Sequence, residues 1–388
     1  MPRSPADPLD TAAALNERAV ALHQEGRYAL AQTRAEQAVE RFARHAGKHH
    51  PDVASCLDTL AMIRMSRGDE RGAVKLLARA LSIFDRYPRV RALRPFRAQS
   101  LARMGDALRA LGRYTEARAV FGRALRVMKG AFGEGSIEHA TALNSYGILC
   151  KFAGWFRPGE RAYLRALAIA EAPPGDPELV CALLHNLGGL EHARDRFAEA
   201  EPYARRGYEL RAERLGENAP EALEDYGALA AIVADLGRFD EAEAMLRALL
   251  ARFEDRYGVS HYEVAVVCHN LASVLSVTER LDEADALYRR ALAIKRARLG
   301  AEHPDVALTL HNLAALCDAR GDAREALALH RKAHALARRT LGPKHPTTVA
   351  CRASLAAAER AARGQRASSL QRSGAYTVID ASETAPTT

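Results

Sequence analysis

The hydrophobic positions of this chain recur with the period of an α-helix, in segments of about 15 to 20 residues that short polar stretches separate. Leu310, Leu313, Ala314 and Cys317, for example, fall within a sector about 100° wide on a helical wheel. The apolar residues are mostly alanine and leucine, and aromatic residues make up only 6% of the chain. Because strands favour β-branched and aromatic residues, this composition predicts an all-α fold.

The helical pattern repeats about every 42 residues. The segment "HNLASVLSVTERLDEADALYRRALAIKRARLG" from His269 aligns without gaps with "HNLAALCDARGDAREALALHRKAHALARRTLG" from His311. Extending this alignment gives eight copies, each with two small residues spaced 12 apart and a polar turn between them. Each copy is therefore predicted to be a pair of antiparallel helices whose backbones cross closely at the small residues. The first small residues are Ala19, Ala61, Gly105, Gly147, Gly188, Ala230, Ala272 and Ala314.

Glycines in the polar turns are expected to end the first helix of a pair in the left-handed conformation. Aspartates soon after them are expected to cap the second helix. The glycines are Gly26, Gly68, Gly112, Gly237 and Gly321, and the aspartates are Asp240, Asp282 and Asp322.

The pattern resembles the tetratricopeptide repeat (TPR), with alanine, an aromatic residue and alanine in the second helix, as at Ala117, Phe121 and Ala124. The 42-residue period, the "LGxxHPxxA" linkers and the "HNLA" motif are similar to the repeats of kinesin light chains. This resemblance implies a right-handed α-solenoid of helix-turn-helix TPR pairs, with the first helix of each pair lining a concave surface. We expect eight repeats over residues 10–346 and a capping helix over 347–364. Residues 1–9 are expected to be a flexible segment, and residues 365–388 a disordered tail.

The sector of the first helices that lies opposite the core carries asparagine in three repeats. These side chains could pair with the backbone of an extended peptide, or they could hydrogen-bond a neighbouring repeat and hold the stack. For the neighbouring histidines, which the wheel also places outside the core, we favour a structural role. The candidate groove residues are Asn186, Asn270, Asn312, His185, His269, His311, Ser273, Glu224 and Asp235.

Catalytic and metal-binding patterns are weak. The wheel turns Cys317 into the core, away from His311, so these two residues cannot form a nucleophile and its base. The six cysteines form no CxxC pair and are expected to be reduced core thiols. His330 and His334 have the spacing of metal ligands but lack a third ligand. No phosphate-binding glycine loop is present. We therefore expect no enzyme activity, cofactor or metal.

The net charge is +8, mostly from arginines that are interleaved with acidic residues. One linker departs from this pattern, since "RYPRVRALRPFRAQ" carries five arginines near Tyr87 and Phe96 that could contact phosphates. They are Arg86, Arg89, Arg91, Arg94 and Arg97. The N-terminus has no apolar signal region, and no apolar run reaches the length of a membrane span. We expect a cytoplasmic protein without a membrane anchor.

These observations predict a non-enzymatic adaptor that holds an extended peptide or a partner helix in the concave groove, chiefly in the last four full repeats. The alternative is a nucleic-acid-associated regulatory protein that uses the basic N-terminal half, where Arg103 lies on the groove sector.

Overall fold

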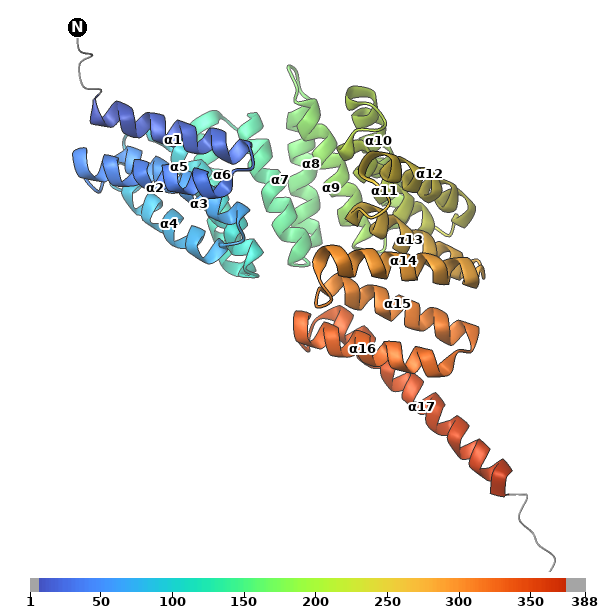
Figure 1. The fold of residues 1–388 in the computed structure, drawn as a ribbon. Coiled ribbons are helices and arrows are strands. Elements are labelled where there is room, and N and C mark those ends of the chain that lie inside the picture. The colour runs from blue at the N-terminus through green and yellow to red at the C-terminus, as the bar shows by residue number, and fades with distance from the viewer. Residues whose placement is uncertain (1–6, 375–388) are drawn as a thin grey trace, which may run out of the picture. The chain divides into compact units, whose positions relative to one another are not determined.

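A computed structural model of the chain describes residues 7–374. These residues form 17 α-helices and one short 3₁₀-helix, without a strand (Figure 1). The chain divides into two compact units, Met1–Arg214 and Leu215–Thr388. Each unit is a stack of antiparallel helix pairs, and the predicted fold class, an all-α solenoid of TPR helix pairs, is confirmed.

The first unit holds the first five repeats, and η1 (Arg91–Leu93) lies in the linker before the third. Its helices are α1 (Pro8–Gln24), α2 (Tyr28–His45), α3 (Pro51–Ser66), α4 (Glu70–Phe84), α5 (Arg94–Ala110), α6 (Tyr114–Phe132), α7 (Ile137–Phe152), α8 (Phe156–Glu171), α9 (Pro177–His192) and α10 (Phe197–Leu215). The odd-numbered helix opens each pair.

The second unit holds three further repeats and a final helix that packs on α16. Its helices are α11 (Pro220–Asp235), α12 (Phe239–Tyr257), α13 (Tyr262–Val277), α14 (Leu281–Leu299), α15 (Pro304–Arg320), α16 (Ala323–Leu341) and α17 (Pro346–Gly374).

The two ends of the chain differ from the predicted boundaries. Helix α1 begins at Pro8, inside the segment predicted to be flexible. Helix α17 continues to Gly374, past the predicted end of the capping helix at residue 364. Residues 1–6 and 375–388, which belong to the predicted flexible segment and the predicted tail, lie outside the described residues.

The turns within the pairs follow the glycine prediction but not the aspartate prediction. Gly26 has φ 73° and Gly321 has φ 80°, both in the left-handed region that favours glycine. Asp240 and Asp282 lie in the first turn of their helices, two residues past the cap residues Arg238 and Arg280. Asp322 occupies the cap position of α16 without a side-chain hydrogen bond. The expectation that aspartates cap the second helices is therefore wrong for Asp240 and Asp282, whereas Asp322 has the predicted position without the capping hydrogen bond.

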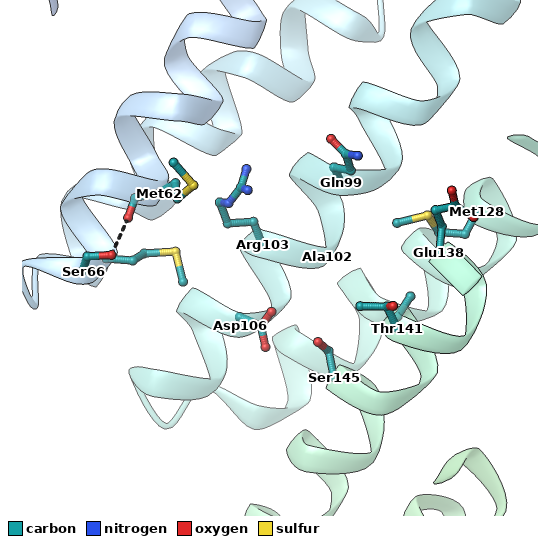
Figure 2. Close-up of a pocket in the computed structure, with 12 residues that line it drawn as sticks. Met62, Ser66, Gln99, Ala102, Arg103, Asp106, Met128, Glu138, Thr141 and Ser145 are labelled. Carbon is teal, nitrogen blue, oxygen red and sulfur yellow. Dashed lines mark hydrogen bonds between the residues drawn. The ribbon is translucent and has the colours of Figure 1, made fainter. Parts of the chain in front are cut away.

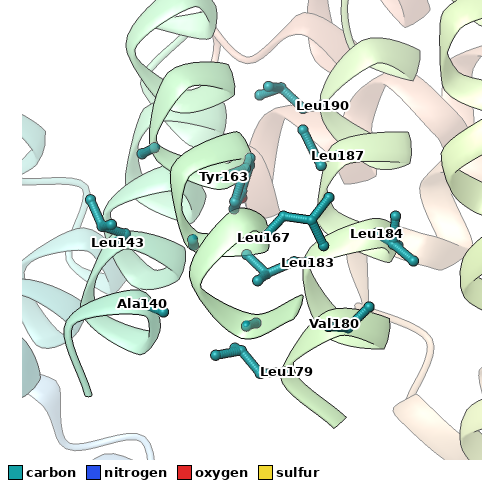
Figure 3. Packing of buried hydrophobic residues seen from close by; sticks show 13 residues of the cluster. Ala140, Leu143, Tyr163, Leu167, Leu179, Val180, Leu183, Leu184, Leu187 and Leu190 are labelled. Carbon is teal, nitrogen blue, oxygen red and sulfur yellow. The ribbon is translucent and has the colours of Figure 1, made fainter. Parts of the chain in front are cut away.

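The core of each repeat forms where the small residues let the helices approach. Tyr163 of α8 is fully buried among leucines of α7 and α9, including Leu143, Leu183 and Leu187 (Figure 3). A Cβ atom on Gly147 would lie 2.4 Å from the Tyr163 ring, so a glycine is needed opposite this large side chain. All six cysteines are buried and unbonded, as predicted.

Candidate functional site

A hollow of about 420 Å³ opens where α3, α5 and α7 lie next to one another. Its apolar lining comes from Met62 and Met65 of α3, Ala102 of α5, Met128 of α6 and Ala142 of α7. Figure 2 shows that side chains from the three first helices surround this space. Methionine is unbranched and polarizable, and it adapts to partners of different shape. The hollow can therefore receive an apolar side chain of a bound partner.

Two of the three charged groups around this hollow, Arg103 and Asp106, already have partners within the fold. Arg103 forms an ion pair with Asp58 of the preceding repeat. The Ser100 hydroxyl donates to Asp58 Oδ1 at 2.8 Å. Burial raises the pKa of Asp106, although the nearby charge of Arg109 opposes this shift. Arg103, which the sequence placed on the groove sector, lines the hollow, but its charge is compensated by Asp58.

A second hollow of about 290 Å³ continues the first one toward α1. The two hollows share Met62, Gln99 and Arg103 as lining residues. Asn16 of α1 and Phe96 of α5 line the far part of the second hollow. We call the two hollows together the first-unit groove, which runs along α1, α3, α5 and α7.

Two of the three predicted groove asparagines join neighbouring repeats. The Asn186 side chain donates from Nδ2 to Asn144 Oδ1 at 2.9 Å. Asn312 Nδ2 lies 3.1 Å from His269 Nε2. In both cases the amide of one repeat hydrogen-bonds a side chain one repeat earlier, as Arg103 does with Asp58. For Asn186 and Asn312 these contacts favour the stacking role over a free binding role.

His269 differs from the expectation that the histidines lie outside the core, because it is only 8% exposed. Its Nδ1 lies 3.3 Å from the Thr309 hydroxyl, which also accepts a hydrogen bond from Lys295 Nζ at 3.1 Å. Desolvation first, and then the Lys295 charge, lower the pKa of His269 to about 4. The ring is therefore neutral at pH 7, and its Nε2 accepts the Asn312 amide. The helical wheel missed this burial because Thr309 and Asn312 of the next repeat cover the ring together with Tyr288 of its own pair, whose ring lies 5.3 Å away.

Asn270 has no such partner. One repeat earlier, α11 presents Gly227 and Ala228, which carry no polar side-chain atoms. Within residues 7–374 the Asn270 side chain makes no hydrogen bond, and it is half-buried. Of the three asparagines, Asn270 alone therefore keeps its amide available for a ligand.

The other predicted groove residues lie in varied surroundings. His185 is exposed, while the half-buried His311 ring lies 6.0 Å from the ring of buried His330. The Ser273 hydroxyl is 2.8 Å from the Tyr288 hydroxyl. Glu224 and Asp235 are exposed on α11. Burial, and then the charge of Glu224, raises the pKa of Glu263 on the next repeat.

The five arginines of the predicted phosphate-contacting linker fall into two groups. Arg97 pairs with Asp85 at 2.7 Å. The remaining four, Arg86, Arg89, Arg91 and Arg94, are exposed, and none has an ion pair in the described part of the chain.

The sequence analysis placed the groove mainly in the last four repeats and did not single out the first-unit methionines. The sequence did contain a sign of this hollow, since four of the six methionines in the chain occur between residues 62 and 128. A methionine at helical spacing is usually part of a core, however, and only the packing of α3, α5 and α7 shows that these line a hollow.

Paired helices with an open groove along the first helices define a TPR-type solenoid. The family model for the tetratricopeptide repeat matches residues 10–86, 96–172, 179–255 and 263–336. These segments cover well over half of the chain, and the chain belongs to the tetratricopeptide repeat family. Repeats of this family support a role in protein interaction.

Several solved structures resemble this chain. The apo form of the quorum sensor NprR from B. thuringiensis is 11% identical with a TM-score of 0.65, and the match covers 86% of this chain and 89% of that one. BtubC (BKLC) from P. vanneervenii is 26% identical with a TM-score of 0.49, over 61% of this chain and 94% of that one. TPR-like repeats of a candidate kinesin light chain from Podosopora anserina are 20% identical with a TM-score of 0.44, and the match covers 53% of this chain and 97% of that one.

No curated protein matches the chain significantly. Across residues 7–374, no helix combines the length and the apolar character that crossing a membrane requires. The cytoplasmic location stays a prediction.

Proposed function

We propose that this protein is a non-enzymatic adaptor that holds a segment of a partner polypeptide in the first-unit groove. The observation that carries this proposal is the methionine-lined hollow between α3, α5 and α7. An apolar anchor from the partner would fill the hollow, and burial of apolar surface would supply most of the binding free energy.

The polar rim is suited to the backbone of such a segment. Gln99 lines both hollows, and its amide offers a donor and an acceptor to a peptide group. Glu138 at the start of α7 is exposed and has no ion pair within the described residues. A basic residue of the partner would therefore be favoured next to the anchor.

In the second unit, we propose that Asn270 contributes the corresponding amide. Its neighbours on the groove sector, Glu224 and Asp235 of α11, are acidic and exposed. This part of the proposal keeps the sequence prediction but limits it to the asparagine without a stacking partner.

The test uses two matched threonines on helix surfaces. Thr141 lines the hollow, whereas Thr33 lies on α2, and both are exposed and hydrogen-bond the carbonyl four residues earlier. Peptides are selected from a random display library on the intact chain, and their affinities are measured by fluorescence anisotropy. We expect Thr141→Trp, which fills the hollow, to weaken binding about tenfold or more. This is the affinity lost when about one apolar side chain of the peptide can no longer be buried. Thr33→Trp should leave the affinity unchanged, and equal effects of the two variants would refute the groove assignment.

A further inference from the structure

The connection between α4 and α5 carries a concentration of uncompensated positive charge. Arg86, Arg89, Arg91 and Arg94 lie within nine residues and are all exposed. Elsewhere in the first unit exposed arginines commonly face an acid, as Arg206 faces Glu171 at 2.6 Å. The four linker arginines have no such partner among residues 7–374, so their guanidinium charges stay exposed to solvent and uncompensated.

The loop before α3 adds further positive charge to the same surface. The Tyr87 hydroxyl donates to the His49 carbonyl oxygen at 3.1 Å and holds the two loops together. The pKa of His49 lies below its ordinary value, through desolvation first and then through the charges of Arg86, Lys48 and Arg79. Positive charges from different elements therefore lower the pKa of the same side chain. We call Lys48, Arg79, Arg86, Arg89, Arg91 and Arg94 the basic patch.

Two acids adjacent in sequence to the patch and its loop already have basic partners. Asp85 is paired with Arg97 at 2.7 Å, and Asp52 lies 3.4 Å from His50 Nδ1. The patch therefore keeps a net positive charge of several units, and such a surface attracts polyanions over roughly a Debye length of about 8–10 Å.

An exposed aromatic ring borders the patch. Phe96 lies two residues after Arg94 in the first turn of α5 and is 48% exposed, although phenylalanine is a residue that folding normally buries. Its ring lines the open second hollow. An exposed ring next to guanidinium groups is the combination that single-stranded nucleic acids bind, because every base can stack on a ring and guanidinium groups pair with phosphate oxygens.

We propose that the basic patch binds single-stranded nucleic acid, with phosphates on Arg86, Arg89, Arg91 and Arg94 and a base stacked on Phe96. An acidic polypeptide would meet the positive charge, but it has no flat base to cover the ring. The contacts are made to phosphates and to the face of a base, so the binding is independent of sequence. This site is separate from the hollow between α3, α5 and α7, although Phe96 also lines the second hollow of the first-unit groove. Binding of nucleic acid does not depend on the proposed adaptor function.

The test measures anisotropy of a fluorescein-labelled oligouridine of about 20 nucleotides with the intact chain. Four phosphate contacts predict a slope of about −3 in a plot of log K against log salt. Changing Arg86, Arg89, Arg91 and Arg94 together to Gln should weaken binding more than about tenfold at low salt. The control changes Arg71, Arg123, Arg126 and Arg161 to Gln, which removes the same charge from exposed positions on α4, α6 and α8. It should weaken binding less than about threefold.

Phe96→Ala should weaken oligouridine binding about tenfold, because it removes one stacking contact. A labelled peptide of ten glutamates tests whether the patch binds an acidic polypeptide instead. We expect this peptide to bind more weakly than the oligouridine at equal salt. Circular dichroism melting shows whether each variant is folded. The proposal is overturned if the intact chain does not retain oligouridine at low salt, if both quadruple variants weaken binding equally, or if the glutamate peptide binds more tightly.

Discussion

Gly147 and Tyr163 show how one missing methyl group determines the packing of a repeat. The ring occupies the space that a Cβ on residue 147 would need. Gly105 stands in the same relation to Phe121, because a Cβ on residue 105 would lie 2.6 Å from the Phe121 ring. Where the second helix carries Leu77 instead of a ring, the first helix carries Ala61. This match holds for these three repeats and is not general, since Ala272 stands opposite the buried ring of Tyr288.

We expect Gly147→Ala to lower the free energy of unfolding by about 1–3 kcal/mol, because the Tyr163 ring must shift within a packed core. The control is Gly130→Ala, at an exposed helical position with no heavy atom within 4 Å of the added Cβ. It should raise stability by about 0.5–1 kcal/mol, since alanine favours the helix. Adding Tyr163→Leu to Gly147→Ala should restore part of the loss. Equal melting temperatures of the two single variants would contradict this account.

His269 makes a pH-dependent contribution to stability. In the unfolded chain the imidazole is protonated below its ordinary pKa of 6.5, whereas in the folded protein the pKa is about 4. Between these values the unfolded state binds more protons, so the free energy of unfolding falls as the pH is lowered through this window. The loss amounts to about 3 kcal/mol once the pH is below 4.

Urea unfolding at pH 7 and at pH 4.5 measures this contribution. His269→Gln keeps an oxygen that can accept the Asn312 amide but does not titrate, so it should show a smaller loss of stability between the two pH values than the native chain. An unchanged pH dependence in the variant would show that His269 is not the group responsible.

At the scale of the helices, neighbouring repeats are joined by side chains that repeat in register. Asn186 with Asn144 and Asn312 with His269 occupy the same two positions of successive first helices. Asn270 occupies the donor position as well, but it faces Gly227 and Ala228. The same residue type in the same column therefore has a stacking role in two repeats and a free amide in the third.

Asn312→Ala should lower the free energy of unfolding by about 1–3 kcal/mol, because it leaves a buried His269 nitrogen without its donor. Asn270→Ala removes no internal hydrogen bond and should change stability by less than about 0.5 kcal/mol. Thermal melting compares the two variants. A larger loss for Asn270→Ala than for Asn312→Ala would contradict the assignment of their roles.

Periodicity in the sequence predicted the helix pairs, the small residues at their crossings and the glycines of their turns, because all of these depend on contacts within one repeat. It did not predict the burial of His269 or the pairing of Arg103 with Asp58, since these depend on which side chains the adjacent repeat presents. The Asp240 and Asp282 prediction failed because the helices begin two residues earlier than the pattern indicated. The methionine-lined hollow depends on three repeats at once, and no single repeat shows it.

At the scale of the whole molecule, each repeat packs mainly on its sequence neighbours within its unit, as solenoids do. The binding surfaces of such a fold follow the first helices. The net charge of +8 is distributed unevenly, because four of the positive charges belong to the exposed linker arginines Arg86, Arg89, Arg91 and Arg94. The groove and the basic patch are therefore chemically distinct surfaces of the first unit, one apolar and one cationic.

Site-specific photo-crosslinking tests most directly whether a partner lies in the first-unit groove. A benzoylphenylalanine replaces Gln99, which is exposed and lines both hollows, and in a control chain it replaces Thr33 on α2. With a library-selected peptide present, we expect irradiation to crosslink the peptide to position 99 and not to position 33. Equal crosslinking at both positions, or crosslinking at position 33 alone, would contradict a partner-binding groove along α1, α3, α5 and α7.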